Sequence, residues 1–203
     1  FAVKLASGET LEARTVILAT LAHIAADLLA ELAPASATLL RQIRHENIGT
    51  LSLVYRDEDI PAKPLINGLM IPRREKRSID AVTVSSRKMP ERAHPGYTLL
   101  RIFFGGAKPE LVTYEDEKLL TAVRAELSDL LNIRAEPLAH DLYRWPAGFP
   151  QAEVGHLERI NAIEASLPAG IFLAGSSYRG IAVPDCIKQG REAAKKIISS
   201  LVE

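Results

Sequence analysis

The chain has 203 residues, of which 47% are hydrophobic, and its 25 Lys and Arg residues balance its 25 Asp and Glu residues. This length allows one large domain or two lobes with a substantial core. The neutral balance argues against a nucleic-acid groove, which normally shows a basic excess, and gives no reason to expect a polybasic membrane anchor. A single cysteine rules out an internal disulfide framework and fits a reducing compartment, so we expect a cytoplasmic protein.

The first third of the chain predicts strands and then helices. It starts with strand-like alternation and without an initiating methionine, which we interpret as the start of a piece cut from a longer protein. We expect two strands around a turn at Gly8 and a buried strand in the apolar run 15–19. A helix over 22–32 follows, and Pro34 opens a second short helix. Charged residues within the apolar window 15–32 argue against a membrane span there.

The middle of the chain is β-rich, and the last third alternates helices and strands. Strands are predicted at 48–55, 68–71, 81–86 and 97–104, with a solvated turn in the charged run 73–77. After them we expect a helix over 115–131, a strand before Trp145, a helix over 152–167, a strand over 171–174 and a final helix over 187–201. This order predicts a mixed α/β (α+β) fold with an α/β lobe from the chain ends and a sheet lobe from the middle.

The loop GSSYRGIAVPDCIKQG joins the last predicted strand to the last helix. Gly175 and Gly180 permit backbone conformations that a Cβ would block. Pro184 suits a first helical turn, and Asp185 puts negative charge near the positive end of the helix dipole, as a capping residue rather than a catalyst. The free N–H groups after Gly180 would then suit anions or electron-rich carbonyls. An ordinary strand-to-helix connection has the same spacing, so spacing alone leaves both interpretations open.

Several segments resemble one enzyme family in the same order. They are ARTVILATLAHIAADLL, the stretch 68–72, SSRKMPERAHPG, LLRIFFGG, YRWPAGFPQAEVGHLERI and GSSYRGIAVPDCIKQGREAAKKI. Together they resemble the oxygen-dependent protoporphyrinogen/coproporphyrinogen oxidases of the FAD-containing amine-oxidase superfamily. The resemblance implies that the chain is the C-terminal part, somewhat under half, of such an enzyme. Because no G-x-G-x-x-G cradle for the FAD pyrophosphate is present in the sequence, we expect this fragment to be inactive alone and not to retain FAD.

The resemblance also implies cofactor contacts. It divides the chain into an FAD-lobe segment at 1–33, a substrate lobe at 34–140 and a second FAD-lobe segment at 141–203. The implied cofactor-binding residues are Ala19, Trp145, Gly175, Gly180, Ile181, Ala182 and Val183. The backbone at 181–183 is expected to touch the flavin ring, although some relatives have glycine where this chain has Ala182. Without the resemblance, Trp145 would be a core or lobe-interface aromatic residue.

The strand 97–104 predicts part of the substrate site. Its alternation separates Thr98, Leu100, Ile102 and Phe104 from Tyr97, Leu99, Arg101 and Phe103. We expect the first set in the core, whereas the second suits a flat apolar ring bearing carboxylates. The resemblance implies that Phe103 lies over a substrate pyrrole and that Met70 and Thr83 supply apolar contacts. Arg101 as a propionate partner is our own hypothesis, with a surface or interlobe salt bridge as the alternative.

The resemblance implies FAD-dependent oxidation of protoporphyrinogen IX or coproporphyrinogen III, with O₂ as electron acceptor, in haem biosynthesis. We name no catalytic side chain, and neither the five histidines nor Cys186 show metal-ligand spacing. Another flavin amine-oxidase-type oxidoreductase and a non-catalytic fragment without FAD are the alternatives. The expected partners are the porphyrinogen, O₂ and the missing N-terminal dinucleotide-binding part of the same protein, without nucleic acid. A peripheral membrane contact is expected only through segments absent from this sequence.

Overall fold

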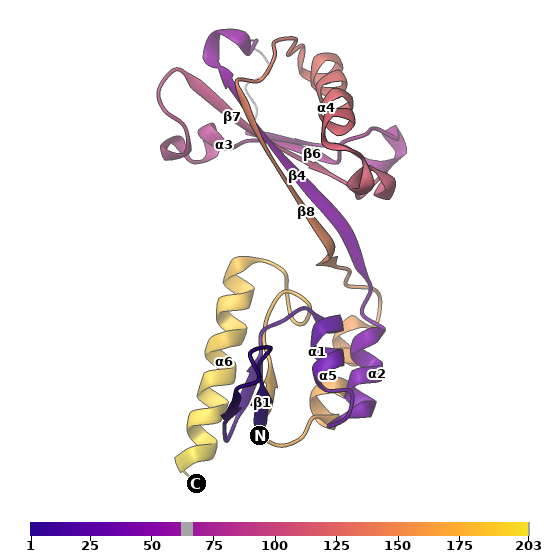
Figure 1. Ribbon diagram of the computed structural model, residues 1–203, viewed down its shortest axis with the longest axis vertical. Coiled ribbons are helices and arrows are strands. Elements are labelled where there is room, and N and C mark those ends of the chain that lie inside the picture. Colours follow the sequence, from indigo (N-terminus) through magenta and orange to yellow (C-terminus); the bar gives the residue numbers. More distant parts are fainter. Residues whose placement is uncertain (62–66, 203) are drawn as a thin grey trace. The chain divides into compact units, whose positions relative to one another are not determined.

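The computed structural model describes residues 1–61 and 67–202, with side chains up to residue 200. The chain forms two compact units, one of Phe1–His45 with Pro150–Glu203 and one of Glu46–Phe149. Both chain ends therefore belong to the same unit (Figure 1). The units change at 45/46 and 149/150, whereas the sequence suggested limits at 33/34 and 140/141. The mixed α/β fold class is confirmed, and the roles assigned to the segments stay predictions.

The first unit combines a small parallel sheet with four helices. Its elements are β1 (Ala2–Lys4), β2 (Thr10–Glu12), β3 (Val16–Leu18), α1 (Ala22–Leu28), α2 (Pro34–Arg41), α5 (His156–Ser166), β9 (Ile171–Leu173) and α6 (Val183–Val202). Strands β1 and β2 pair antiparallel, whereas β3 pairs in parallel with β9. Segments from the two ends of the sequence thus meet in one sheet, whose strands end at the same edge.

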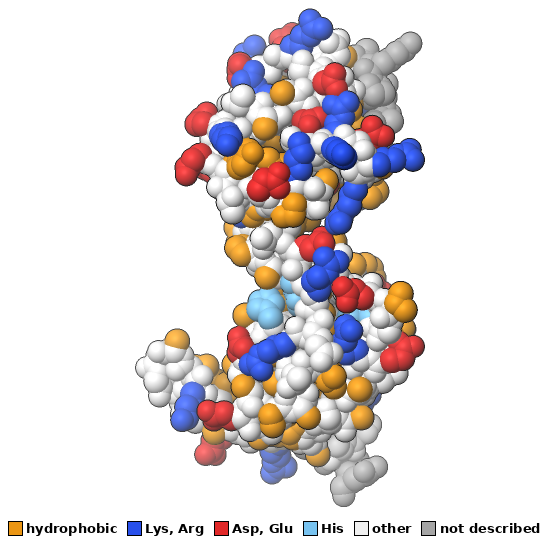
Figure 2. Space-filling model, turned by 90° about the vertical axis from the view of Figure 1, so that its right-hand side faces the viewer, with side chains coloured by type: hydrophobic (Ala, Val, Ile, Leu, Met, Phe, Trp, Pro, Cys, Tyr) orange, Lys and Arg blue, Asp and Glu red, His pale blue; other side chains and the backbone are white. Residues whose placement is uncertain are grey.

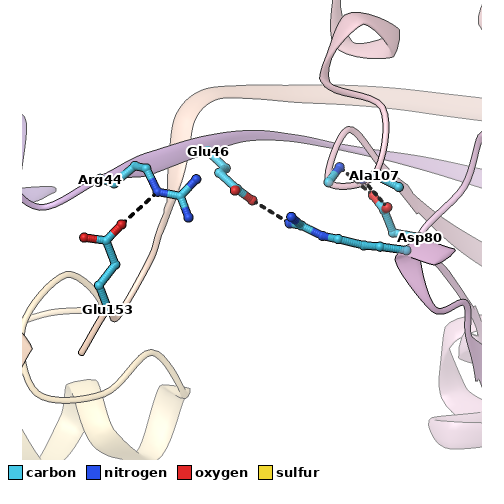
Figure 3. Close-up of polar contacts among 7 residues, drawn as sticks. Arg44, Glu46, Asp80, Ala107 and Glu153 are labelled. Atoms are coloured by element: carbon cyan, nitrogen blue, oxygen red, sulfur yellow. Dashed lines mark hydrogen bonds and ion pairs between the residues drawn. The ribbon is translucent and has the colours of Figure 1, made fainter. Parts of the chain in front are cut away.

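Small side chains let the helices of the first unit pack closely. Ala22, Ala25 and Ala26 of α1 are fully buried in one cluster with Leu40 of α2 and Ile160 of α5. Helix α1 is shorter than the sequence predicted, because it ends at Leu28 and the chain turns before Pro34. Beside these helices, the guanidinium of Arg44 donates to Glu153 at 3.2 Å (Figure 3).

The second unit is a five-stranded sheet covered by a long helix. Its elements are β4 (His45–Arg56), β5 (Gly68–Met70), β6 (Ala81–Val84), α3 (Ser85–Lys88), β7 (Tyr97–Phe104), α4 (Asp116–Leu131) and β8 (Ala139–Pro150), with short 3-10 turns at Asp57–Asp59, Arg73–Glu75, Pro90–Arg92 and Pro109–Thr113. The strand order is β5-β6-β7-β4-β8, and the pairs β4–β7, β5–β6 and β6–β7 are antiparallel. The predicted strand 81–86 ends early, because Ser85 begins α3.

Helix α4 packs on one face of this sheet. Leu119, Val123 and Leu127 are fully buried against a cluster that includes Ile102 and Phe104. Leu120, next to Leu119, is only partly buried. The spacing of Leu119, Val123 and Leu127 therefore forms one apolar stripe that faces the sheet.

Polar contacts within the second unit hold its loops in place. The carboxylate of Asp80 accepts the N–H groups of Gly106 and Ala107, both at 2.7 Å, which holds the loop after β7 (Figure 3). The charged run 73–77 is more than a solvated turn, because Arg73 pairs with Glu46 at 3.1 Å and Arg77 pairs with Glu126 of α4 at 3.0 Å.

Strand β8 lies at the edge of the sheet and runs past Trp145, although the sequence suggested a strand only before this residue. Pro146 and Gly148 interrupt the strand pattern in the sequence, so the full length of β8 was not predicted. An edge strand tolerates both residues. The N–H of Ala147, at φ 47°, donates to the side chain of Asn47 at 2.8 Å.

On the face that Figure 2 shows, acidic and basic side chains are interspersed over both units, so this face has no patch of a single charge. This distribution agrees with the equal numbers of acidic and basic residues. Over 1–61 and 67–202, every helix lacks the length or the apolar run needed to cross a membrane.

Candidate functional site

A buried amide on α6 holds the glycine loop that joins β9 to α6. The Oε1 atom of Gln189 accepts the N–H groups of Gly175 and Arg179, at 3.2 and 3.3 Å. Its Nε2 atom donates to the carbonyl of Gly180 at 3.3 Å. Gln189 is only 7% exposed and was not among the residues predicted from the sequence. The available signal was a polar residue one helical turn before the buried Ala193.

The same loop is fixed to the segment after β3. The N–H of Ala22 donates to Ser177 Oγ at 3.1 Å, and the Tyr178 hydroxyl donates to the carbonyl of Thr20 at 2.9 Å. On its other side, His156 Nε2 lies 2.7 Å from the Tyr178 carbonyl oxygen. Burial raises the pKa of Tyr178 above its usual range, so the hydroxyl stays protonated and remains a donor.

Both predicted loop glycines adopt backbone conformations that L side chains avoid. Gly175 has φ +133° and Gly180 has φ +138°. A Cβ on Gly175 would lie 3.6 Å from the carbonyl oxygen of Ala19, so these two predicted cofactor residues are neighbours. A Cβ on Gly180 would lie only 2.6 Å from the carboxylate of Asp185. Glycine at position 180 therefore lets the loop pass directly over the first turn of α6.

The backbone between Gly180 and α6 presents free donors. The side chains of Ile181 and Val183 are 46% and 72% exposed. The N–H groups of Ile181 and Ala182 have no acceptor within the described part of the chain. Helical hydrogen bonding begins where the N–H of Cys186 donates to the carbonyl of Ala182. These donors and the positive end of the α6 dipole fit the electron-rich edge of a flavin ring.

All four predicted substrate residues share one face of the sheet in the second unit. The cross-strand rows are Met70–Ala81–Phe103–Thr50 and Gly68–Thr83–Arg101–Ser52. Residues paired in this way point to the same side of a sheet. Their neighbours along β7, Ile102 and Phe104, lie in the core under α4, so Phe103 and Arg101 face away from this helix. The structure thus brings together residues that are 33 positions apart in sequence, from Met70 to Phe103.

This face combines apolar, hydroxyl and cationic groups. Met70 is 85% exposed, whereas Phe103, Thr83 and Arg101 are half-buried. The side chain of Arg101 forms no hydrogen bond or ion pair with any described residue, and its buried Nε has no partner there. The alternative of a salt bridge within this unit is therefore not seen among the described residues.

Trp145 lies on β8, in the second unit, and is 41% exposed. Its ring tilts by 46° against Tyr143, with the ring centroids 4.3 Å apart. Leu142 packs against the core, so strand alternation places Tyr143 and Trp145 on the opposite face, as for Phe103. Because Trp145 and the glycine loop belong to different units, their shared contact with a cofactor stays a prediction.

The described residues offer no side-chain cluster for a metal site. Among residues 1–61 and 67–202, no group of His, Cys, Asp and Glu is placed to hold a metal ion. Cys186 is half-buried, with its Sγ 3.9 Å from the carbonyl oxygen of Gly180.

Comparisons with known proteins cover nearly the whole chain. Residues 1–198 match the family described as flavin containing amine oxidoreductase. The chain is 30% identical, over 99% of its length, to coproporphyrinogen III oxidase of Bacillus subtilis, and it covers 43% of that protein. It is 27% identical, over 95% of its length, to the chloroplastic protoporphyrinogen oxidase of Nicotiana tabacum and covers 37% of it.

Solved structures also match nearly the whole chain. A structure assigned as a protoporphyrinogen oxidase, from Exiguobacterium sp. 255-15, superposes with a TM-score of 0.79 at 26% identity, over 97% of this chain and 43% of that one. Reduced UDP-galactopyranose mutase superposes with a TM-score of 0.78 at 15% identity, over 100% of this chain and 45% of that one, and shows the fold alone. The chain spans less than half the length of these relatives. These findings confirm the resemblance that the sequence motifs indicated.

Proposed function

The chain belongs to the flavin containing amine oxidoreductase family, and on this premise we propose that the complete protein oxidises a porphyrinogen to a porphyrin, using FAD and O₂, in haem biosynthesis. The observation that carries the proposal is the match of 99% of the chain to a protein named coproporphyrinogen III oxidase. The geometry supports it, because one unit offers free donors at a helix start and the other a sheet face with an aromatic ring and a cation.

The first turn of α6 would hold the flavin ring. When bound, FAD would supply the redox chemistry, accepting hydride equivalents from the substrate and passing the electrons to O₂. The N–H groups of Ile181, Ala182 and Val183 would stabilise negative charge on the ring edge, because helix N-termini favour it and need no reorganisation. Gly175, Gly180 and the adjacent Ala19 would allow the close backbone approach.

The sheet face would hold the substrate. We propose that Phe103 packs against a pyrrole ring and that Met70 and Thr83 line the same surface. Trp145 would contact the cofactor at the end of this face. These side chains would orient the macrocycle and exclude water, and we assign no proton-transferring side chain.

The proposal covers two substrates and a cellular location. Protoporphyrinogen IX and coproporphyrinogen III differ at two substituents, vinyl in one and propionate in the other, and nothing in the described face selects between them. The single cysteine and balanced charge support a cytoplasmic location. We also propose that this chain alone is inactive and does not retain FAD, since the Gly-rich pyrophosphate cradle is absent from the sequence.

The test is a turnover assay of the complete protein with each porphyrinogen, with porphyrin fluorescence as the readout. We expect porphyrin to form in air. Under argon we expect at most one porphyrin for every three flavins, because six electrons leave each porphyrinogen and each flavin accepts only two. A complete protein that binds FAD but forms porphyrin from neither substrate would contradict the proposal. A flavin absorption spectrum of the purified 203-residue chain, which we expect to be colourless, tests the statement on the fragment separately.

A further inference from the structure

Arg101 occupies a central position on the sheet face opposite α4. Its strand, β7, lies between β6 and β4, with further strands beyond both. Its cross-strand neighbours are Thr83 and Ser52. Both carry hydroxyl groups, so neither position supplies the negative charge that a guanidinium in the middle of a sheet would normally meet.

Among the half-buried arginines of its unit that the structure describes, Arg101 is the one without a counter-ion. Arg77 pairs with Glu126 and Asp129 on α4, and Arg144 pairs with Asp116. Arg101 forms no such pair with a described residue, and its Nε is buried without an acceptor. Arginine stays protonated at any physiological pH. A half-buried, permanent cation with an unsatisfied N–H group therefore calls for an anionic acceptor from outside the described chain.

The surroundings narrow the kind of anion. Leu99 and Phe103 flank Arg101 on the same face of β7, and Val54 and Thr50 face them across β4. These side chains favour a flat apolar body, and the guanidinium favours a planar carboxylate that accepts two hydrogen bonds. A ligand that satisfies both is an apolar ring system with a carboxylate on a short arm.

We propose that Arg101 binds a propionate carboxylate of the tetrapyrrole whose ring lies against Phe103. This inference rests on the proposed function and extends it, because it assigns the substrate's charge to one residue. Both candidate porphyrinogens carry propionates, so Arg101 recognises the substrate class and does not distinguish its two members.

The test compares Arg101→Gln and Arg101→Lys in the complete, FAD-containing protein. Coproporphyrinogen III is one substrate and its tetramethyl ester, which lacks the carboxylate charges, is the other. For the free acid, we expect Arg101→Gln to raise KM and to weaken binding of the product coproporphyrin III on the order of 30-fold, with kcat nearly unchanged. Arg101→Lys should recover part of the loss, and the ester should show no difference between the variants.

Arg134→Gln is the matched control, since it removes the same charge from an exposed position after α4. We expect wild-type KM for this variant. The inference is overturned if Arg101→Gln affects acid and ester equally, as an ion pair with another part of the complete protein would, or if it affects neither. Failure of the proposed function looks different, because the wild-type protein would then form no porphyrin from either porphyrinogen.

Discussion

Replacing Gly180 by alanine should disrupt the glycine loop at the start of α6. Its φ of +138° lies in a region that costs an L residue about 1–3 kcal/mol. The added Cβ would lie 2.6 Å from Asp185 Oδ2 and 2.8 Å from Asp185 Cβ, so the first turn of α6 must shift, which costs about 1–3 kcal/mol more. We therefore expect Gly180→Ala to lower the free energy of unfolding by about 2–6 kcal/mol.

Gly190→Ala is the matched control for this variant. Gly190 also lies on α6, but a Cβ there would meet no atom within 4 Å. Alanine in a helix interior is more favourable than glycine, so we expect a gain of about 0.5–1 kcal/mol. An Asp185→Ala background should remove the clash with the carboxylate but keep the clash with the Cβ of residue 185, so a double-mutant cycle isolates the carboxylate's share of the cost.

The assay should report on the first unit rather than the whole chain, because two units need not unfold together. Hydrogen–deuterium exchange of peptides covering 175–190, read alongside urea denaturation by circular dichroism, meets this need. Equal effects of Gly180→Ala and Gly190→Ala, within about 0.5 kcal/mol, would refute the loop geometry described above.

Three further predictions concern other parts of the chain. Asp80→Asn should cost about 1–3 kcal/mol, because the amide leaves one of two partly buried N–H groups without an acceptor; an unchanged urea midpoint would contradict this. Burial lowers the pKa of His45, so the unfolded chain binds its proton more readily and stability should fall as pH drops below about 6.5; His45→Gln should reduce this slope, and an identical pH profile would count against it. Gly49→Ala should cost about 3 kcal/mol, because its Cβ would lie 2.0 Å from the buried Phe104 ring; a thermal melt within 1 °C of wild type would show that the ring moves freely.

Local periodicity predicted much of the sheet and its faces. The alternation within 97–104 correctly placed Leu100, Ile102 and Phe104 in the core, because side-chain direction in a strand depends only on sequence parity. It also put Arg101 and Phe103 on the opposite face, as the register shows. The glycine loop and the helix after it were likewise visible as a strand, two glycines and an apolar helical pattern.

Contacts between distant segments could not be predicted in the same way. Gln189 holds Gly175 and Gly180 through side-chain hydrogen bonds, and a single polar residue on a helix carries no signal of its partners. Ser177 and Tyr178 bond to the segment near Thr20, more than 150 positions away in sequence. The length of β8 was missed because its proline and glycine break the local pattern, whereas pairing with β4 maintains the strand.

The proposal that α6 begins against the flavin is tested most directly by a crystal structure of the complete protein with FAD bound. We predict hydrogen-bond distances, about 2.7–3.2 Å, from backbone nitrogens among Ile181, Ala182 and Val183 to the pyrimidine edge of the isoalloxazine. A structure in which other protein atoms cover these nitrogens, with the isoalloxazine bound elsewhere, would contradict the account.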